Sequence, residues 1–106
     1  MANVIWTKRA SEQLDSIVNY IAANSPSNAA RFAEGAVWAT HRLTLFPRAG
    51  GIVEELQILA IREILFGSYR LLYRIDGDTC HILAMFHGSR DLRSAFDPLR
   101  DWPSEG

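Results

Sequence analysis

The 106-residue sequence has little lysine, one cysteine and no long apolar run. Lys8 is the only lysine, and the formal net charge is -1, so the chain lacks the global positive field typical of nucleic-acid-binding proteins. The lone Cys80 argues against a disulfide framework and fits a reducing compartment. No apolar stretch approaches the ~18 residues of a membrane span, and the first residues lack a basic-then-apolar secretory leader. These features predict a cytoplasmic protein.

Sequence patterns for metals and cofactors are also missing. His41, His81 and His87 show no metal-ligand spacing, and no Ser-His-Asp arrangement can be argued from the spacing. The pair at 50–51 follows a predicted helix and indicates a turn rather than a phosphate-binding loop. We therefore expect no metal and no cofactor. The length, with 48% hydrophobic and 22% charged residues, indicates one domain covering residues 1–106.

Two stretches have apolar residues at helical spacing. The first predicts a helix over about 8–23, with Thr7 as its N-cap and an apolar stripe formed by Ala10, Leu14, Ile17, Val18 and Ile21. Ser25 and Pro26 suit the start of a second helix, which we expect to reach about Phe46. Its inner face would consist of Ala29, Phe32, Ala33, Ala36, Thr40 and Leu43. The short link predicts an antiparallel helical hairpin.

Four stretches are rich in strand-forming residues, at 3–6, 61–66, 69–75 and 79–87. Residues 52–60 fit a short strand, a helical turn or both, and the segment from Leu92 to Trp102 fits a short final helix or a tail packed over an edge. The predicted order is β-α-α-β-β-β. We expect an α+β fold in which the helical hairpin packs on one face of a small, mainly antiparallel sheet.

The Asp76-Gly77-Asp78 sequence between two strands indicates a hairpin. With Asp76 and Gly77 at the centre of the turn, the expected pairs are Ile75–Asp78, Tyr73–Cys80, Leu71–Ile82 and Tyr69–Ala84. Since side chains alternate along a strand, these residues would face the helices. The opposite face would gather Arg70, Leu72, Arg74, Leu83, Met85 and His87. We expect that face to be open or half-covered and to offer arginines to a partner.

Several segments resemble the RelE/ParE family of bacterial toxins from type II toxin–antitoxin systems. The matching pieces are VIWTKRASEQLDSIVNYI, SPSNAARF, LFPRAGG and IREILFGSYRLLYRIDGDTCHILAMFHGSRDL. They cover nearly the whole chain in the family's order, and YRLLYRI followed by HGSRD is the most telling. The pattern is more similar to the ParE branch than to RelE proper.

The resemblance implies a growth-inhibiting toxin that a co-expressed antitoxin neutralises. ParE-type members are described as inhibitors of DNA gyrase, whereas RelE-type members cleave messenger RNA in the ribosomal A site. Arg70 and Arg90 match the two RelE-type arginines that stabilise phosphate charge. Phe96 falls where RelE-type enzymes have a tyrosine for proton transfer, and a phenyl ring cannot transfer a proton.

The candidate site residues form two groups. Arg70, Arg74 and Arg90 are candidates for pairing with acidic groups of a partner. The alternative for Arg70 and Arg74 is that they are solvated arginines of the sheet, and the alternative for Arg90 is that it pairs with Asp91 or caps the terminal segment. His87 fits a structural histidine that holds a strand end, or an acid–base group. A second group lies on the outer side of the second predicted helix and consists of Trp38, His41 and Leu45. Because exposed tryptophan favours interfaces, we expect contact there with antitoxin or a second protomer.

Three hypotheses follow. The first is a ParE-like gyrase inhibitor silenced by antitoxin. The second is a ribosome-dependent endoribonuclease that uses Arg70, His87 and Arg90. The third is a family member that only binds antitoxin and is not toxic. A homodimer, or a heterotetramer with antitoxin, is compatible with each of them.

Overall fold

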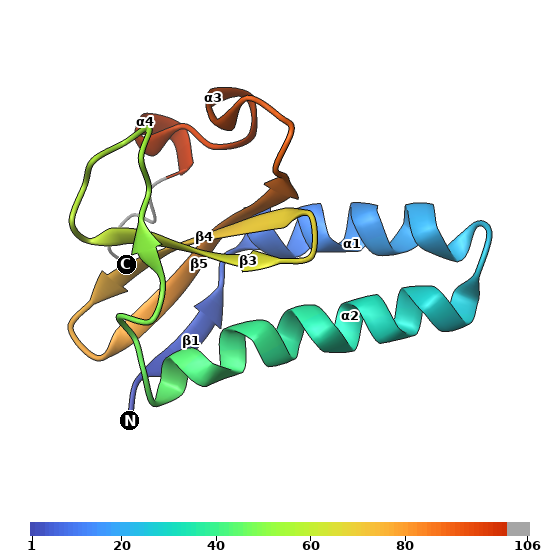
Figure 1. Cartoon of the computed structure of the whole chain (residues 1–106), viewed down its shortest axis with the longest axis horizontal. Helices are drawn as coiled ribbons and strands as arrows, with labels where there is room; N and C mark the ends of the chain where they lie inside the picture. Colours follow the sequence, from blue (N-terminus) through green and yellow to red (C-terminus); the bar gives the residue numbers. More distant parts are fainter. Residues whose placement is uncertain (102–106) are drawn as a thin grey trace.

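The computed structural model describes residues 1–101 and contains a five-stranded sheet with two helices on one face (Figure 1). The strands are β1 (Asn3–Trp6), β2 (Gly51–Ile52), β3 (Ile61–Phe66), β4 (Tyr69–Asp76) and β5 (Thr79–His87). Their order across the sheet is β1-β5-β4-β3-β2, and only the β1–β5 pair is parallel. The predicted α+β architecture is confirmed, and the first strand, β1, lies beside the last, β5.

The two long helices form the predicted antiparallel hairpin. Helix α1 (Lys8–Ala22) begins at the Thr7 N-cap, whose hydroxyl oxygen accepts the Ala10 backbone N–H. Helix α2 (Pro26–His41) begins at Ser25, and a 3-10 turn, η1 (Arg42–Thr44), follows it. The expected inner face of α2 is largely buried, with Ala29, Ala36, Thr40 and Leu43 at 3% exposure or less. In Figure 1 the far end of the hairpin extends past the sheet.

The hairpin of β4 and β5 differs from the expected register. Gly77 and Asp78 form the turn, because Asp76 pairs with Thr79, and Gly77 has a φ of +59°. An irregularity in β5 lies opposite Leu72 and Tyr73, where the pairing skips Leu83. The observed pairs are Ile75–Cys80, Tyr73–Ile82, Leu71–Met85 and Tyr69–His87. The expected pairs were therefore wrong.

The irregularity also corrects the assignment of faces. A β-bulge places two residues of one strand against one of the other and shifts the alternation beyond it by one residue. Met85 consequently packs on the helix side and Ala84 on the far side, the reverse of the expectation. His87 is likewise on the helix side, where its ring lies 5.4 Å from that of Tyr69. Arg70 and Leu72 remain on the far side, as expected.

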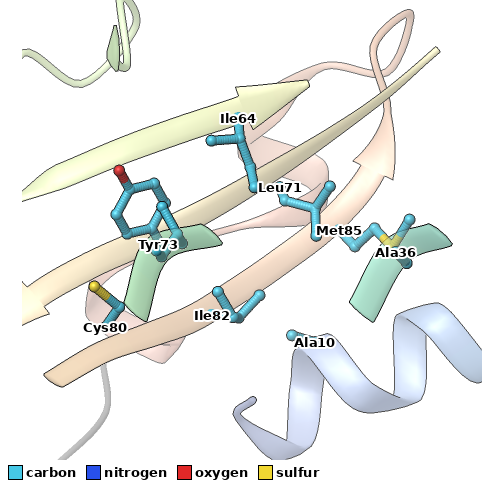
Figure 2. Close-up of a cluster of buried hydrophobic side chains, with 9 residues drawn as sticks. Ala10, Ala36, Ile64, Leu71, Tyr73, Cys80, Ile82 and Met85 are labelled. Carbon is cyan, nitrogen blue, oxygen red and sulfur yellow. The ribbon is translucent and has the colours of Figure 1, made fainter. Parts of the chain in front are cut away.

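Each face of the sheet carries its own hydrophobic core. The first core lies under the helices, and Figure 2 shows its residues from both helices and from β3, β4 and β5. The second core lies on the far face and consists of Val53, Ile61, Leu72, Leu83, Ala84, Phe86, Leu92, Ala95 and Phe96. The expectation of an open or half-covered far face was therefore wrong. The loop after β2 and the C-terminal segment bury it instead.

The C-terminal segment forms two short helices, α3 (Leu92–Ala95) and α4 (Pro98–Asp101). Helix α1 holds this segment in place, since the Arg9 guanidinium and the Gln13 amide both donate hydrogen bonds to the Ala95 carbonyl. The Arg9 side chain also lies 3.3 Å from the Asp101 carboxylate. Of the two sequence-based alternatives, short helices packed on the sheet are observed, and Trp102 lies outside the described residues.

Candidate functional site

The Arg70 guanidinium, one of the three residues of the ribonuclease hypothesis, is held by two carboxylates. Its Nε and Nη2 donate to Glu63 at 2.7 and 3.3 Å, and its Nη1 and Nη2 donate to Glu55 at 2.7 and 2.9 Å. The group also lies 5.4 Å from the centre of the Phe86 ring, and its side chain is only 14% exposed. The usual bidentate sites of an arginine for a phosphate are thus already occupied.

The electrostatics of this cluster oppose the binding of an anion. One guanidinium and two carboxylates give a net charge of -1, since +1 and twice -1 are brought together within hydrogen-bond distance. The hydrogen bond from Arg70 lowers the pKa of Glu55 to about 2, although burial opposes the shift. The hydrogen bonds from Glu55 and Glu63 raise the pKa of Arg70. The Glu55–Arg70 ion pair therefore persists at physiological pH.

Arg74 occupies the same face of β4 and is largely inside the protein. Its side chain is 10% exposed, and its Nη1 lies 3.6 Å from the Asp76 carboxylate. Together with the Arg70 cluster, this placement corrects the picture of arginines displayed on an open sheet face. These two guanidinium groups mainly hold neighbouring parts of the chain together.

Phe96 is fully buried in the second core. Its ring therefore packs against the sheet and supplies neither a hydroxyl group nor an exposed surface. The residues of the ribonuclease hypothesis do not all lie on one face of the sheet. Arg70 lies on the far face, whereas His87 lies beside Tyr69 on the helix side.

His87 and Arg90 meet at another location, the β5-end pocket. We define it by Gln13, Ile17, Tyr69, Met85, Phe86, His87 and Arg90, which line a cavity of about 240 Å³. It lies between α1 and the end of β5. Both His87 and Arg90 are exposed at its edge. The sequence suggested these two residues, whereas Gln13 and Tyr69 join them only through the packing of α1 and β4 against β5.

The second predicted group forms an exposed apolar surface on α2 and on the residues just after η1, which we call the α2 patch. It consists of Val37, Trp38, His41, Leu45 and Phe46. Trp38 is 70% exposed, and its ring lies edge-on to that of His41 with the ring centres 5.3 Å apart. Leu45 and Phe46 are 63% and 64% exposed.

Two shallow hollows adjoin the α2 patch. One, of about 370 Å³, is lined by Ala33, Glu34, Val37 and Trp38. The other, of about 510 Å³, is lined by Leu45, Phe46, Pro47, Arg48 and Ala49. Large apolar side chains are normally inside a protein, so a cluster of them around hollows is typical of a surface that another protein covers. Sequence reasoning identified the centre of this surface but not Val37 or Phe46.

Within the described residues, other kinds of site are not found. No group of three or more potential metal ligands comes together in residues 1–101. No helix in that part of the chain is long and apolar enough to cross a membrane. The residues predicted from the sequence thus come together at two surface sites, the α2 patch and the β5-end pocket.

The fold, a helical hairpin packed on a small sheet, is also found in a solved structure. A solved structure described as the chromosomal ParDE TA system from P. aeruginosa superimposes with a TM-score of 0.67 at 20% identity, covering 82% of this chain and 96% of that one. A curated relative, Toxin RelE2 of Caulobacter vibrioides, is 32% identical over 91 residues, which is 85% of this chain and 99% of the relative.

The family model described as "ParE toxin of type II toxin-antitoxin system, parDE" matches residues 4–92. The chain therefore belongs to the ParE toxin family within the wider RelE/ParE group. It is the toxin component of a type II toxin–antitoxin system, and membership of this family implies a cognate antitoxin as its partner.

Proposed function

We propose that this toxin inhibits DNA gyrase by direct binding in the cytoplasm and that its antitoxin silences it by covering the α2 patch. The first part of the proposal, gyrase inhibition rather than RNA cleavage, rests on the ion pairs of the Arg70 guanidinium. In a ribonuclease of the RelE type, this arginine would stabilise the phosphate charge of the transition state. Here Glu55 and Glu63 occupy it, and the cluster has a net negative charge.

Two further observations favour a protein target over RNA. Phe96 has no ionisable group at the position where a proton-transfer residue would be needed, and its ring is buried in the second core. The chain also has only one lysine and a net charge of -1, whereas RNA-binding proteins neutralise phosphates with clustered basic residues. A toxin that acts through protein contacts requires neither feature.

The test compares the two activities directly with purified wild-type toxin. We expect it to inhibit DNA supercoiling by gyrase and to leave messenger RNA intact on translating ribosomes. Cells that express it should form filaments and induce the DNA-damage response. Cleaved transcripts with undisturbed supercoiling would instead establish the ribonuclease hypothesis, and Arg70→Ala and His87→Ala would then identify its site. Normal growth at verified expression would leave only the non-toxic, antitoxin-binding alternative.

The second part of the proposal, silencing by the antitoxin, rests on the composition of the α2 patch. Its apolar side chains lie beside Arg42 and Arg48, both exposed, so the surface suits an amphipathic segment with acidic flanks. Tryptophan is enriched among the hot-spot residues that dominate binding energy, and truncation of a hot-spot residue costs at least about 2 kcal/mol. Trp38 is therefore expected to contribute most.

The partner for this test is the protein encoded by the neighbouring gene, expected to be small and acidic. We expect Trp38→Ala to weaken its binding by roughly thirtyfold or more, because about 2 kcal/mol corresponds to that factor. Tyr20→Ala is the matched control, since Tyr20 is an exposed aromatic residue on α1, outside the patch. In cells, Trp38→Ala should remain toxic but escape neutralisation. Equal binding by both variants would place the antitoxin elsewhere.

A further inference from the structure

The β5-end pocket presents hydrogen-bond donors around an apolar interior. Ile17, Met85 and Phe86 supply apolar surface, and Tyr69, His87 and Arg90 supply polar groups. None of the lining side chains is a carboxylate. Such a pocket suits a ligand that has a short apolar portion and a negatively charged end.

The hydrogen bonds around His87 determine which of its ring nitrogens can donate a hydrogen bond to a ligand. The Ser89 backbone N–H donates to Nδ1 at 3.1 Å, and the Ser89 hydroxyl lies 2.7 Å from the same atom. A backbone N–H is always a donor, so Nδ1 must accept. The neutral ring therefore carries its proton on Nε2, which leaves an N–H group available to donate.

Arg90 differs from the two arginines of β4 in its surroundings. Its guanidinium makes one hydrogen bond, from Nη2 to the Ser94 carbonyl at 3.3 Å. Within residues 1–101 no carboxylate lies within 4.0 Å of it, whereas Arg70 has two such carboxylates and Arg74 has one. A guanidinium has five N–H donors, so most of those on Arg90 remain available to a ligand.

The remaining polar wall of the pocket is rigid. The Gln13 side chain accepts the Met85 backbone N–H at 2.7 Å and donates to the Ala95 carbonyl at 3.2 Å. These two bonds join α1 to β5 and to α3, which fixes the distance between the walls. Tyr69 is held by edge-on contacts with Phe32 and His87, and its hydroxyl has no hydrogen-bond partner in the described part of the chain.

We propose that the β5-end pocket binds the carboxylate of a glutamate or aspartate side chain that a protein partner inserts. Arg90 would bind the carboxylate, with the His87 Nε2–H as a second donor, while Ile17 and Met85 contact the methylene groups. The assignment to a protein carboxylate, rather than a phosphate, rests on the proposed function, in which the toxin acts through protein contacts. A single available guanidinium also matches the single charge of a carboxylate.

The experiment is an NMR titration of the full chain with blocked leucyl-glutamyl-leucine. The matched ligand is leucyl-glutaminyl-leucine, which keeps the shape and removes the charge, and inorganic phosphate is the third probe. We expect the glutamyl peptide to shift the resonances of Met85, His87 and Arg90. Replacing glutamyl by glutaminyl, or making Arg90→Ala, should weaken its binding roughly tenfold, as expected for a charge-assisted hydrogen bond. Arg93→Ala, an exposed arginine outside the pocket, should bind like wild type.

The possible outcomes separate the alternatives. Equal binding of the two peptides, no shifts in the pocket, or unchanged binding by Arg90→Ala would overturn the proposal. Phosphate that binds more tightly than the glutamyl peptide and displaces it would also overturn it and assign the pocket to phosphate groups. Gyrase inhibition by the wild type is measured independently, so its failure would reject the proposed function without changing the titration result.

Discussion

At the scale of single residues, sequence reasoning singled out individual positions but not the residues that they contact. Arg70 and Phe96 were both singled out, and both lie at defined places in the second core or beside it. Glu55 and Glu63, which determine what Arg70 can bind, carry no recognisable sequence signal. Glu55 lies in the loop between β2 and β3, fifteen residues before Arg70, and only the folded chain brings them together.

The Glu55–Arg70 pair predicts a specific pH dependence. Because the pKa of Glu55 is lowered from its usual 4.5 to about 2, the ionised carboxylate favours the folded state. Its contribution to stability is complete above pH 4.5 and is lost as the pH falls towards 2. A carbon-detected NMR titration should show Glu55 changing protonation near pH 2, and Arg70→Ala should return the midpoint towards 4.5. A Glu55 midpoint near 4.5 in the wild-type protein would mean that the ion pair does not form in solution.

At the scale of secondary-structure elements, the sequence predicts most of the fold. Both N-caps, the inner face of α2 and the three long strands have the positions that their patterns indicate. The irregularity in β5 was missed because residues 82–86 are all apolar and all buried, so no alternation marks the extra residue. The covering of the far face was missed for a related reason. Polar and charged residues interrupt the apolar ones in residues 92–101, and in this part of the chain Leu92, Ala95 and Phe96 belong to the core.

The hydroxyl group of Tyr73 on β4 joins the loop after α2 to the sheet by hydrogen bonds. Tyr73 on β4 is fully buried, and its hydroxyl donates to the Pro47 carbonyl at 2.7 Å and accepts the Gly50 N–H at 2.9 Å. The backbone at Gly50 approaches so closely that a Cβ there would lie 2.4 Å from the Glu63 carbonyl oxygen. The loop after α2 is therefore fixed to the sheet at this point.

Removing that hydroxyl should loosen the loop. Tyr73→Phe leaves the buried Gly50 N–H and the partly buried Pro47 carbonyl without their partner, which costs about 1–3 kcal/mol of unfolding free energy. Tyr20→Phe, at a residue 79% exposed, should change it by less than about 0.5 kcal/mol. Denaturant titrations of both variants measure the difference, and amide hydrogen exchange at Gly50 should accelerate in Tyr73→Phe alone. Similar stability of the two variants would show that the hydroxyl does not fasten the loop.

At the scale of the whole molecule, two cores share one set of strands. β4 and β5 contribute side chains to the core under the helices and to the core under the C-terminal segment. Neither core can lose its packing without disturbing strands that the other core needs. We therefore expect the described part of the chain to unfold as one cooperative unit, although its helices and its C-terminal segment lie on opposite faces.

Ile82 and Leu83 test this coupling, because they are adjacent on β5, fully buried, and belong to different cores. Replacing either with alanine leaves a cavity and should lower the free energy of unfolding by about 2–5 kcal/mol. Leu65→Ala, at a residue 67% exposed on β3, should have little effect. In each variant, transitions followed by far-ultraviolet and near-ultraviolet circular dichroism should coincide. If Leu83→Ala released the far face at low denaturant while the helical signal persisted to the wild-type midpoint, the two faces would be independent and the shared strands would not couple them.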